Sequence, residues 1–272
     1  MSQAEPLTQP APTVTTARPL SMSVVIPSYN NLPVLVKCLK SLYKTSWQYG
    51  QSSQLEILVQ DDCSDFDIYD VIGMEPAQAQ RNPVNLGFAG NCNAGAHRAK
   101  GDVILFLNQD TVAREGWFEP LLGMFQHDNV GIVGPKLVLP DNKIQSCGGW
   151  YGGNRGPFHR YLGWDANDWR VNVCERVSWI TGAALAIRRE LFFKVGGFDV
   201  GYERGYFEDT DLCEKVKEAG FEVWYCHEAV FEHNVGTSGG VPQHIFKANS
   251  LRFHQRWDAK IKPDTAVIHV PY

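Results

Sequence analysis

The sequence has no excess of basic residues, and this absence argues against one class of partner. Lysine and arginine total 25 against 30 acidic residues, which gives a formal net charge of −5. A domain that binds nucleic acid is expected to present a basic face. The composition therefore gives no support for nucleic acid as a partner.

Closely spaced cysteines and long apolar runs are also missing. The seven cysteines lie far apart without a C-x-x-C pair, which argues against a disulfide framework or a zinc ribbon and favours a reducing compartment. The longest nearly apolar stretch, Val177 to Ile187, is too short to span a bilayer. Residues 1–21 lack the apolar segment of a signal peptide. We expect a cytoplasmic protein, and the sequence leaves open peripheral contact with the inner face of the membrane.

What is present is the composition of a soluble globular chain. Of its 272 residues, 44% are hydrophobic and 20% are charged, so the chain can bury one sizeable core. Residues 1–21 contain four prolines and no hydrophobic period, and we predict a disordered tail there. Order is expected to begin near Ser23.

One buried strand, with the polar segment that follows it, gives the first indication of a site. Val103 to Leu107 is an unbroken apolar run, the pattern of a strand buried on both faces of a mainly parallel sheet. Asn108, Gln109 and Asp110 follow at once. Ligands of open α/β sheets collect beyond the carboxyl ends of strands, and a carboxylate held there suits a divalent cation shared with phosphates. An isolated Asn-x-Asp is more often a plain polar corner, so the hypothesis depends on other segments.

The first half of the chain contains further strands that end in polar segments. We predict strands over 23–26 (stopped by Pro27), 55–59 and 103–107, and helices from the N-cap Asn31 to about Tyr43, over 89–100 and over 117–126. Strands alternating with helices through short loops predict a doubly wound α/β layer. The second strand also ends in an acidic loop, Gln60-Asp61-Asp62. A nucleotide crevice is the default hypothesis for such a pair of loops.

The pattern changes after Val130. Residues 136–176 are rich in Gly, Asn, Trp and Tyr with weak periodicity, which fits either a β-rich insertion packed by its own aromatics or a wall that stacks on acceptor sugars or lipids. The remaining predicted elements are strands over 130–133, 177–187 and 221–226, helices over 188–194, 209–219 and 243–257, and a polar flexible loop over 233–238. Glu208, Asp209 and Asp211 lie at one helix N-terminus, where acids are common for electrostatic reasons alone.

Eight motifs then occur in one order along the chain. They are Val-Val-Ile-Pro-Ser-Tyr-Asn (24–30), Asp-Asp-Cys-Ser (61–64), Asn-Leu-Gly-Phe (85–88), Leu-Asn-Gln-Asp (107–110), Thr-Gly-Ala (181–183), Gly-Gly-Phe-Asp (196–199), Glu-Asp-Thr-Asp-Leu (208–212) and the segment 233–238. Together they resemble the family 2 inverting glycosyltransferases of the GT-A fold. Within that family, the motifs are most similar to those of bacterial rhamnosyltransferase-like members. The resemblance covers about residues 22–240.

The resemblance implies a GT-A fold, which is an α/β class with a mainly parallel doubly wound sheet. It implies a single domain over 22–272, with a nucleotide-sugar-binding half (22–135), a smaller mixed acceptor and catalytic half (136–242), and a C-terminal helix and tail (243–272).

The resemblance also implies roles for individual residues. Donor nucleotide binding falls to Pro27, Tyr29, Asp61, Asn85, Gly87, Asn93 and Asn108, with Asp61 accepting from the pyrimidine N3–H. Asp110 and His233 would bind Mg²⁺ or Mn²⁺, and Asp209 would be the catalytic base. Acceptor contacts are expected at Trp150, Trp164, Trp169 and Glu208. Asn108 stands where the D-x-D element has its first acid, which leaves the choice of metal open.

The chemistry of sugar transfer independently needs these residue types. A divalent cation stabilises charge on a departing diphosphate, and a carboxylate takes the proton of the acceptor hydroxyl. The function predicted is transfer of a sugar, with inversion, from dTDP-rhamnose or a UDP-sugar to a glycan or lipid-linked glycan in bacterial surface polysaccharide synthesis. Simpler interpretations stay open: Asp61 as a turn residue, His233 as a solvated loop histidine and Asp209 as a helix-end charge.

Two other functions compete with sugar transfer. A sugar nucleotidyltransferase usually has a basic, glycine-rich loop near its N-terminus, and residues 24–31 contain neither glycine nor a cation. A silent nucleotide-sugar or glycan-binding module would have lost its base or a metal ligand, yet Asp110, Asp209 and His233 are all present. The sequence does not identify the acceptor, the linkage or the oligomeric state.

Overall fold

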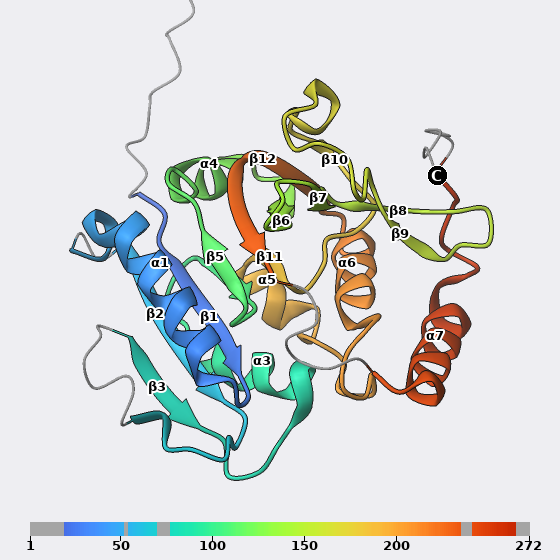
Figure 1. Cartoon of the computed structure of the whole chain (residues 1–272). Coiled ribbons are helices and arrows are strands. Elements are labelled where there is room, and N and C mark those ends of the chain that lie inside the picture. The colour runs from blue at the N-terminus through green and yellow to red at the C-terminus, as the bar shows by residue number, and fades with distance from the viewer. Residues whose placement is uncertain (1–18, 52–53, 70–76, 235–240, 265–272) are drawn as a thin grey trace, which may run out of the picture.

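The computed structural model describes residues 19–51, 54–69, 77–234 and 241–264 (Figure 1). The predicted disordered tail thus lies almost wholly outside the described residues, as do residues 235–240 of the predicted polar loop. Within the described part of the chain, no helix combines the length and the apolar character that crossing a membrane requires.

A ten-stranded sheet forms the centre of the molecule, in the order β10-β12-β6-β11-β4-β1-β2-β3, with β5 paired to β12 and β7 to β6. The strands are β1 (Met22–Ser28), β2 (Leu55–Asp61), β3 (Gln78–Arg81), β4 (Val103–Leu107), β5 (Thr111–Ala113), β6 (Val130–Val138), β7 (Ile144–Ser146), β10 (Glu175–Arg176), β11 (Ala184–Arg188) and β12 (Glu222–His233). Strands β3, β2, β1 and β4 run parallel, as do β6 and β12. The mainly parallel α/β class is confirmed.

Strand β11 decides which strand ends meet. It pairs antiparallel with β4 on one side and with β6 on the other, so β4 and β6 run in the same direction. The carboxyl ends of β1, β2, β4, β6 and β12 therefore lie along one edge of the sheet, together with the amino end of β11. We call this the C-terminal edge.

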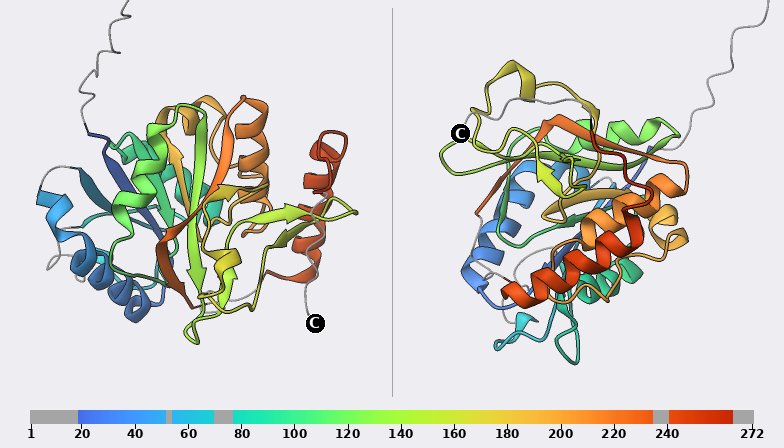
Figure 2. Two further views of the ribbon diagram at one scale, coloured as in Figure 1. Left: turned by 90° about the horizontal axis from the view of Figure 1, so that it is seen from above. Right: turned by 90° about the vertical axis from the view of Figure 1, so that its right-hand side faces the viewer.

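Helices cover both faces of the sheet (Figure 2). They are α1 (Leu32–Gln51), α3 (Gly87–Arg98), α4 (Phe118–Gly123) with the short 3-10 turn η1 (Met124–Gln126), α5 (Arg189–Lys194), α6 (Glu208–Glu218) and α7 (Gln243–Trp257). Leu105 and Leu107 of β4 pack into the core under α1 and α4, whereas Ile104 and Phe106 pack into the core under α3, α5, α6 and α7. Because alternate residues face opposite sides, an unbroken apolar strand is what a two-sided core requires.

Two strands run further than their sequence patterns predict. Strand β1 does not stop at Pro27 but continues to Ser28 beside β2. The neighbour on its other side, β4, pairs only with Met22 to Val25, so at Pro27 the missing N–H removes no bond to β4. Strand β12 continues past Cys226 to His233 because β6 and β5 pair with this stretch as well. His233 is therefore a strand residue, and the prediction of a flexible loop there is wrong.

The predicted strand over 177–187 is too long at its start. Only Ala184–Arg188 form β11, and Thr181 to Ala183 make a turn that begins at the C-terminal edge. The N–H of Gly182 donates to a side chain of α6 instead of a neighbouring strand. Helix α1 extends beyond Tyr43 to Gln51, and β6 extends beyond Val133 to Val138.

The aromatic segment forms a β-rich insertion beside the sheet. It contains β7, the hairpin β8 (Gly149–Tyr151) and β9 (Pro157–His159), the 3-10 turn η2 (Trp169–Val171) and β10. Tyr161 and Val171 of the insertion form a small core with Tyr225 of β12, and Trp164 packs against that core.

Candidate active site

The structure gathers most of the predicted site residues at the C-terminal edge. Asp61 ends β2, Tyr29 follows β1, Asn108 to Asp110 follow β4, Thr181 to Ala183 precede β11, and His233 ends β12. Helix α6 starts at Glu208 beside the turn before β11. These side chains come from distant parts of the sequence, and the sheet order brings them together.

Asp61 is completely buried at the end of β2. Its carboxylate accepts the hydroxyl of Ser64 and, at 3.2 Å, the N–H of Ser64, and the Arg81 guanidinium lies 3.6 Å away. These contacts hold the loop after β2 in place. They are also the contacts of a turn residue, and recognition of a pyrimidine by Asp61 stays a prediction.

Asp62 is a site residue that the sequence patterns did not single out. Its two carboxylate oxygens accept the N–H groups of Leu86 and Gly87 at 2.8 and 2.9 Å, so it caps the start of α3. Gly87 has a φ of +71°, which glycine adopts at little cost. Asn85 donates to the Asp62 carbonyl at 3.2 Å. The sequence carries no specific signal for this cap, because α1 and α7 also lack acids in their first turns.

Gln109 ties the loops after β1 and β4 together. Its Oε1 accepts the Ser28 hydroxyl at 2.8 Å, and its Nε2 donates to the Tyr29 carbonyl at 3.0 Å. Asn108 is fixed through its backbone, because its N–H donates to the Ala183 carbonyl at 2.9 Å. The exposed ring of Tyr29 and the half-buried residues Pro27 and Asn108 thus lie on a rigid part of the edge.

Asp110 and His233 form a pair across 123 residues of sequence. His233 Nε2 lies 3.1 Å from Asp110 Oδ1, and both side chains are buried. On the other side of the ring, Gln145 Oε1 lies 3.3 Å from Nδ1. In the tautomer whose Nδ1–H donates to Gln145, the Nε2 lone pair faces Asp110.

This pair has the geometry of two ligands on one cation. Two ligands bound at about 2.1 Å and at right angles to each other are about 3 Å apart, which is the separation observed. The carboxylate oxygen suits Mg²⁺ or Mn²⁺, and an imidazole nitrogen suits transition-metal ions. The donor set therefore fits a divalent metal with its remaining positions open to phosphate and water.

His159 lies close enough to His233 to interact with it, and sequence patterns gave it no role. Its Nδ1 is 3.1 Å from the Ser146 hydroxyl, and its ring packs against Trp179. Burial lowers the pKa of His159 to about 4. His159 is therefore neutral at physiological pH and adds no charge near the pair.

Three acids at the start of α6 have different surroundings. Asp211 is fully buried and is bound by Trp257 Nε1 at 2.8 Å and by Lys215 Nζ at 3.2 Å. Glu208 is also buried, and its Oε2 has no hydrogen-bond partner among the described residues. Asp209 is partly accessible. Only Asp209 can be reached by a substrate at the edge.

The carboxylate of Asp209 is held by two backbone groups. Its Oδ2 accepts the Gly182 N–H at 2.8 Å and its Oδ1 accepts the Thr210 N–H at 2.7 Å. Burial raises the pKa of this carboxyl, and the two N–H groups act in the opposite direction. For Glu208, burial and the charge of Asp209 raise the pKa well above its ordinary value. Asp209 thus remains the better proton acceptor of the two.

The entry to α6 has an unusual backbone. Residues 204–207 have successive φ values of 59°, 132°, 70° and 75°, a conformation that non-glycine residues adopt only when their surroundings enforce it. Asn249 of α7, which is buried, donates from Nδ2 to the carbonyls of Glu203 at 3.0 Å and Gly205 at 2.9 Å. The signal was present in the sequence, because Asn249 interrupts a buried stripe that also contains Ile245, Phe253 and Trp257.

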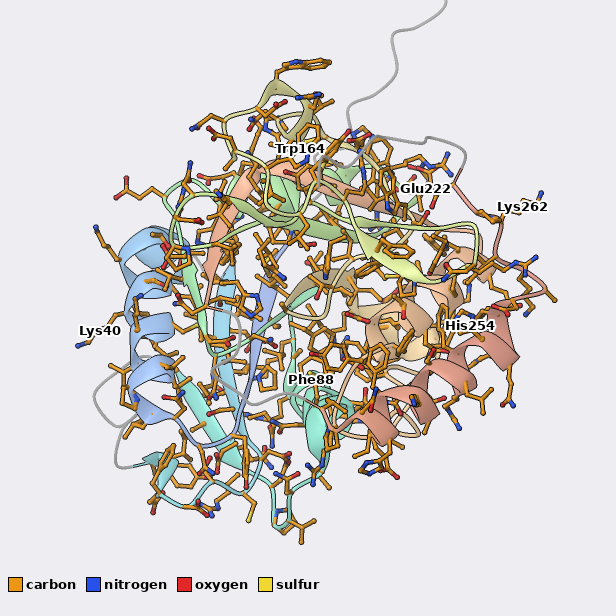
Figure 3. All side chains as sticks on the ribbon, turned by 45° about the vertical axis from the view of Figure 1, so that its right-hand side comes forward. Lys40, Phe88, Trp164, Glu222, His254 and Lys262 are labelled. Atoms are coloured by element: carbon orange, nitrogen blue, oxygen red, sulfur yellow. The ribbon has the colours of Figure 1, made fainter. Side chains whose placement is uncertain are left out.

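Some of the predicted site residues bind other parts of the chain or lie away from the C-terminal edge. Asn93 forms two hydrogen bonds with the backbone of Phe198, at 2.9 and 3.0 Å. Trp164 lies in the insertion, apart from Phe88 (Figure 3), whereas Phe88 packs near Gly182 at the edge. Arg170 stacks on the Trp164 ring at 4.1 Å.

The other two tryptophans also belong to the insertion. Trp150 accepts the indole N–H of Trp179 on its carbonyl, and Trp169 is 75% exposed in η2. Acceptor contacts by the three tryptophans stay predictions.

Comparison with known proteins gives concordant results. A family model described as Glycosyl transferase family 2 matches residues 23–179. The chain is 30% identical over 219 residues to a pre-mycofactocin glycosyltransferase of Mycobacterium tuberculosis, covering 78% of this chain and 42% of that protein. It is 32% identical over 154 residues to an N-acetylglucosaminyl-diphospho-decaprenol L-rhamnosyltransferase of the same species, covering 52% of this chain and 50% of that protein.

Among solved structures, GalNAc-T7 with UDP, GalNAc and Mn²⁺ has a TM-score of 0.72 at 20% identity and covers 88% of this chain and 48% of that chain. At this identity the likeness concerns the fold. The chain spans half or less of the length of these relatives.

Proposed function

The chain belongs to glycosyl transferase family 2 and has its GT-A fold, and from this we propose that it transfers a sugar from a nucleotide-diphosphate donor with inversion at the anomeric carbon. The observation that carries the proposal is the C-terminal edge itself. It holds a buried carboxylate–imidazole pair with the spacing of two metal ligands and, across the turn before β11, one accessible carboxylate.

We assign the donor to the part of the edge formed by β1, β2 and β4. Asp61 and Tyr29 would contact the base, and Asn85, Gly87 and Asn108 would face the ribose and diphosphate. Asp110 and His233 would hold a divalent metal, which when bound neutralises charge on the diphosphate. Related structures support this, since GalNAc-T7 is described with UDP and Mn²⁺. Whether this chain uses Mg²⁺ or Mn²⁺ depends on Asn108, which brings no charge.

We assign Asp209 as the base that takes the proton of the acceptor hydroxyl. The hydroxyl oxygen attacks the anomeric carbon, its proton passes to the Asp209 carboxylate, and the bond from that carbon to the diphosphate oxygen breaks with its electron pair. The N–H groups of Gly182 and Thr210 orient Asp209 and favour its ionised form. Glu208, buried beside it, would contact the acceptor only after a local rearrangement.

For the substrates we propose dTDP-rhamnose or a UDP-sugar as donor and a glycan or lipid-linked glycan as acceptor, in bacterial surface polysaccharide synthesis at the inner face of the membrane. The rhamnosyltransferase among the relatives supports this choice.

The test is thermal unfolding with UDP-, dTDP- and GDP-sugars in the presence of Mg²⁺, Mn²⁺ or EDTA. A donor at a hundredfold its dissociation constant should add about 2.7 kcal/mol to the free energy of unfolding. No shift with any nucleotide sugar and metal would contradict the proposal.

A further inference from the structure

A second cluster of metal-binding side chains lies away from the C-terminal edge, where β10 meets β12. These strands pair antiparallel, with Glu175 opposite Tyr225 and Arg176 opposite Trp224. Continuing this register by one residue places Cys174 opposite Cys226. Two thiols separated by 52 positions in the sequence (226 − 174) are thereby brought side by side.

A bulge in β12 adds a carboxylate to the thiols. The pairing of β12 with β6 jumps from Cys226, opposite Pro135, to Val230, opposite Lys136. Residues 227–229 are therefore extra on β12, and extra residues re-aim the side chains of a strand. The thiol sulfurs of Cys174 and Cys226 and a carboxylate oxygen of Glu228 all lie within 4.8 Å of one another.

The spacing and the donor atoms suit zinc. Tetrahedral Zn²⁺ with Zn–S bonds of about 2.3 Å and Zn–O bonds of about 2.1 Å holds its ligand atoms roughly 3.5–3.8 Å apart. Small side-chain rotations bring three atoms within 4.8 Å to that spacing. Thiolates select zinc over magnesium or manganese, so the cluster differs in preference from Asp110 and His233.

The three side chains of the cluster differ in their exposure to solvent. Cys226 is buried, Cys174 is half-buried and Glu228 is exposed. An ion can therefore enter from solvent past Glu228 and come to rest against the buried sulfur. The fourth position of a tetrahedral ion would face solvent and take water.

We propose that Cys174, Cys226 and Glu228 form a zinc site that fastens the end of the insertion to β12. Both cysteines bind metal as thiolates, so binding of Zn²⁺ displaces the thiol protons into solvent.

Cobalt titration of the reduced protein tests the site, because Co²⁺ bound by thiolates gives a charge-transfer absorption that oxygen and imidazole ligands do not give. We expect this band in the wild type and its loss on adding Zn²⁺. Cys174→Ser should abolish the band, and Glu228→Gln, an exposed change that leaves folding intact, should weaken cobalt binding at least tenfold. Cys63→Ser and Asp110→Asn are the controls and should keep the band.

Three results would overturn the site. The first is a reduced wild type that gives no thiolate–cobalt band. The second is a band that survives Cys174→Ser unchanged. The third is a disulfide between Cys174 and Cys226 that forms in protein prepared without reductant, combined with no cobalt binding after that disulfide is reduced. The assay uses no nucleotide sugar, so its outcome is independent of the proposed transferase activity.

Discussion

Replacing Asp209 with Asn tests the assignment of the base most directly. In the wild type each carboxylate oxygen accepts one backbone N–H, from Gly182 at 2.8 Å and from Thr210 at 2.7 Å. An amide has only one acceptor oxygen, so its NH₂ must face one of these N–H groups. The variant therefore loses the proton acceptor and one of its two anchoring hydrogen bonds.

The two losses have different sizes. A positioned general base contributes 10²–10⁴ to the rate, so turnover should fall on the order of a thousandfold. An unsatisfied buried N–H costs about 1–3 kcal/mol, so the free energy of unfolding should fall by about that amount. Donor binding should be retained, because the donor groups assigned above lie on other loops.

The assay is single-turnover release of the nucleoside diphosphate, measured across pH, beside nucleotide binding. Burial raises the pKa of Asp209, and a base works when deprotonated. Wild-type turnover should therefore fall, as the pH is lowered, at a pH above the ordinary aspartate range, and the variant should lose this limb. Glu208→Gln is the matched control and should keep most of its turnover. The assignment is wrong if Glu208→Gln loses turnover while Asp209→Asn keeps it.

Three further changes probe the surroundings of the base. Asp110→Ala should abolish turnover and metal-dependent nucleotide binding, which calorimetry with Mn²⁺ and with EDTA would show; unchanged metal dependence would move the metal elsewhere. Glu208→Gln should raise the free energy of unfolding at neutral pH. The pKa of buried Glu208 is raised, so the folded state keeps a proton that the unfolded chain releases above about pH 4.5. In urea unfolding, wild-type stability should therefore fall relative to the variant as the pH rises above that value, and stability–pH curves that run parallel for the two proteins would refute this. Asn249→Ala should leave the carbonyls of residues 203 and 205 without their hydrogen-bond donor, which should lower the free energy of unfolding by about 1–3 kcal/mol. Turnover should fall more than the affinity for the nucleotide sugar. Unchanged kinetics would show that residues 203–207 keep their conformation without Asn249.

Elements whose signals are local can be located from the amino-acid sequence alone. The five apolar residues of β4 form a strand with the predicted bounds, and α7 runs over the predicted residues 243–257. Periodicity and end signals act within a few residues, so such elements can be located without knowledge of their neighbours. The order of eight short motifs also sufficed to identify the family.

Features that depend on which strands are neighbours follow from the three-dimensional arrangement of the chain. Nothing local extends β12 to His233; the pairing with β5 and β6 does, and that pairing sets His233 against Asp110. Three acids at one helix end look alike in sequence, yet contacts made by Trp257 and Lys215 occupy Asp211 and leave Asp209 accessible. The sulfurs of Cys174 and Cys226 likewise meet only because β10 returns beside β12. Side-chain chemistry is written in the sequence, but the distance between two side chains far apart in the chain follows from the order and register of the strands that hold them.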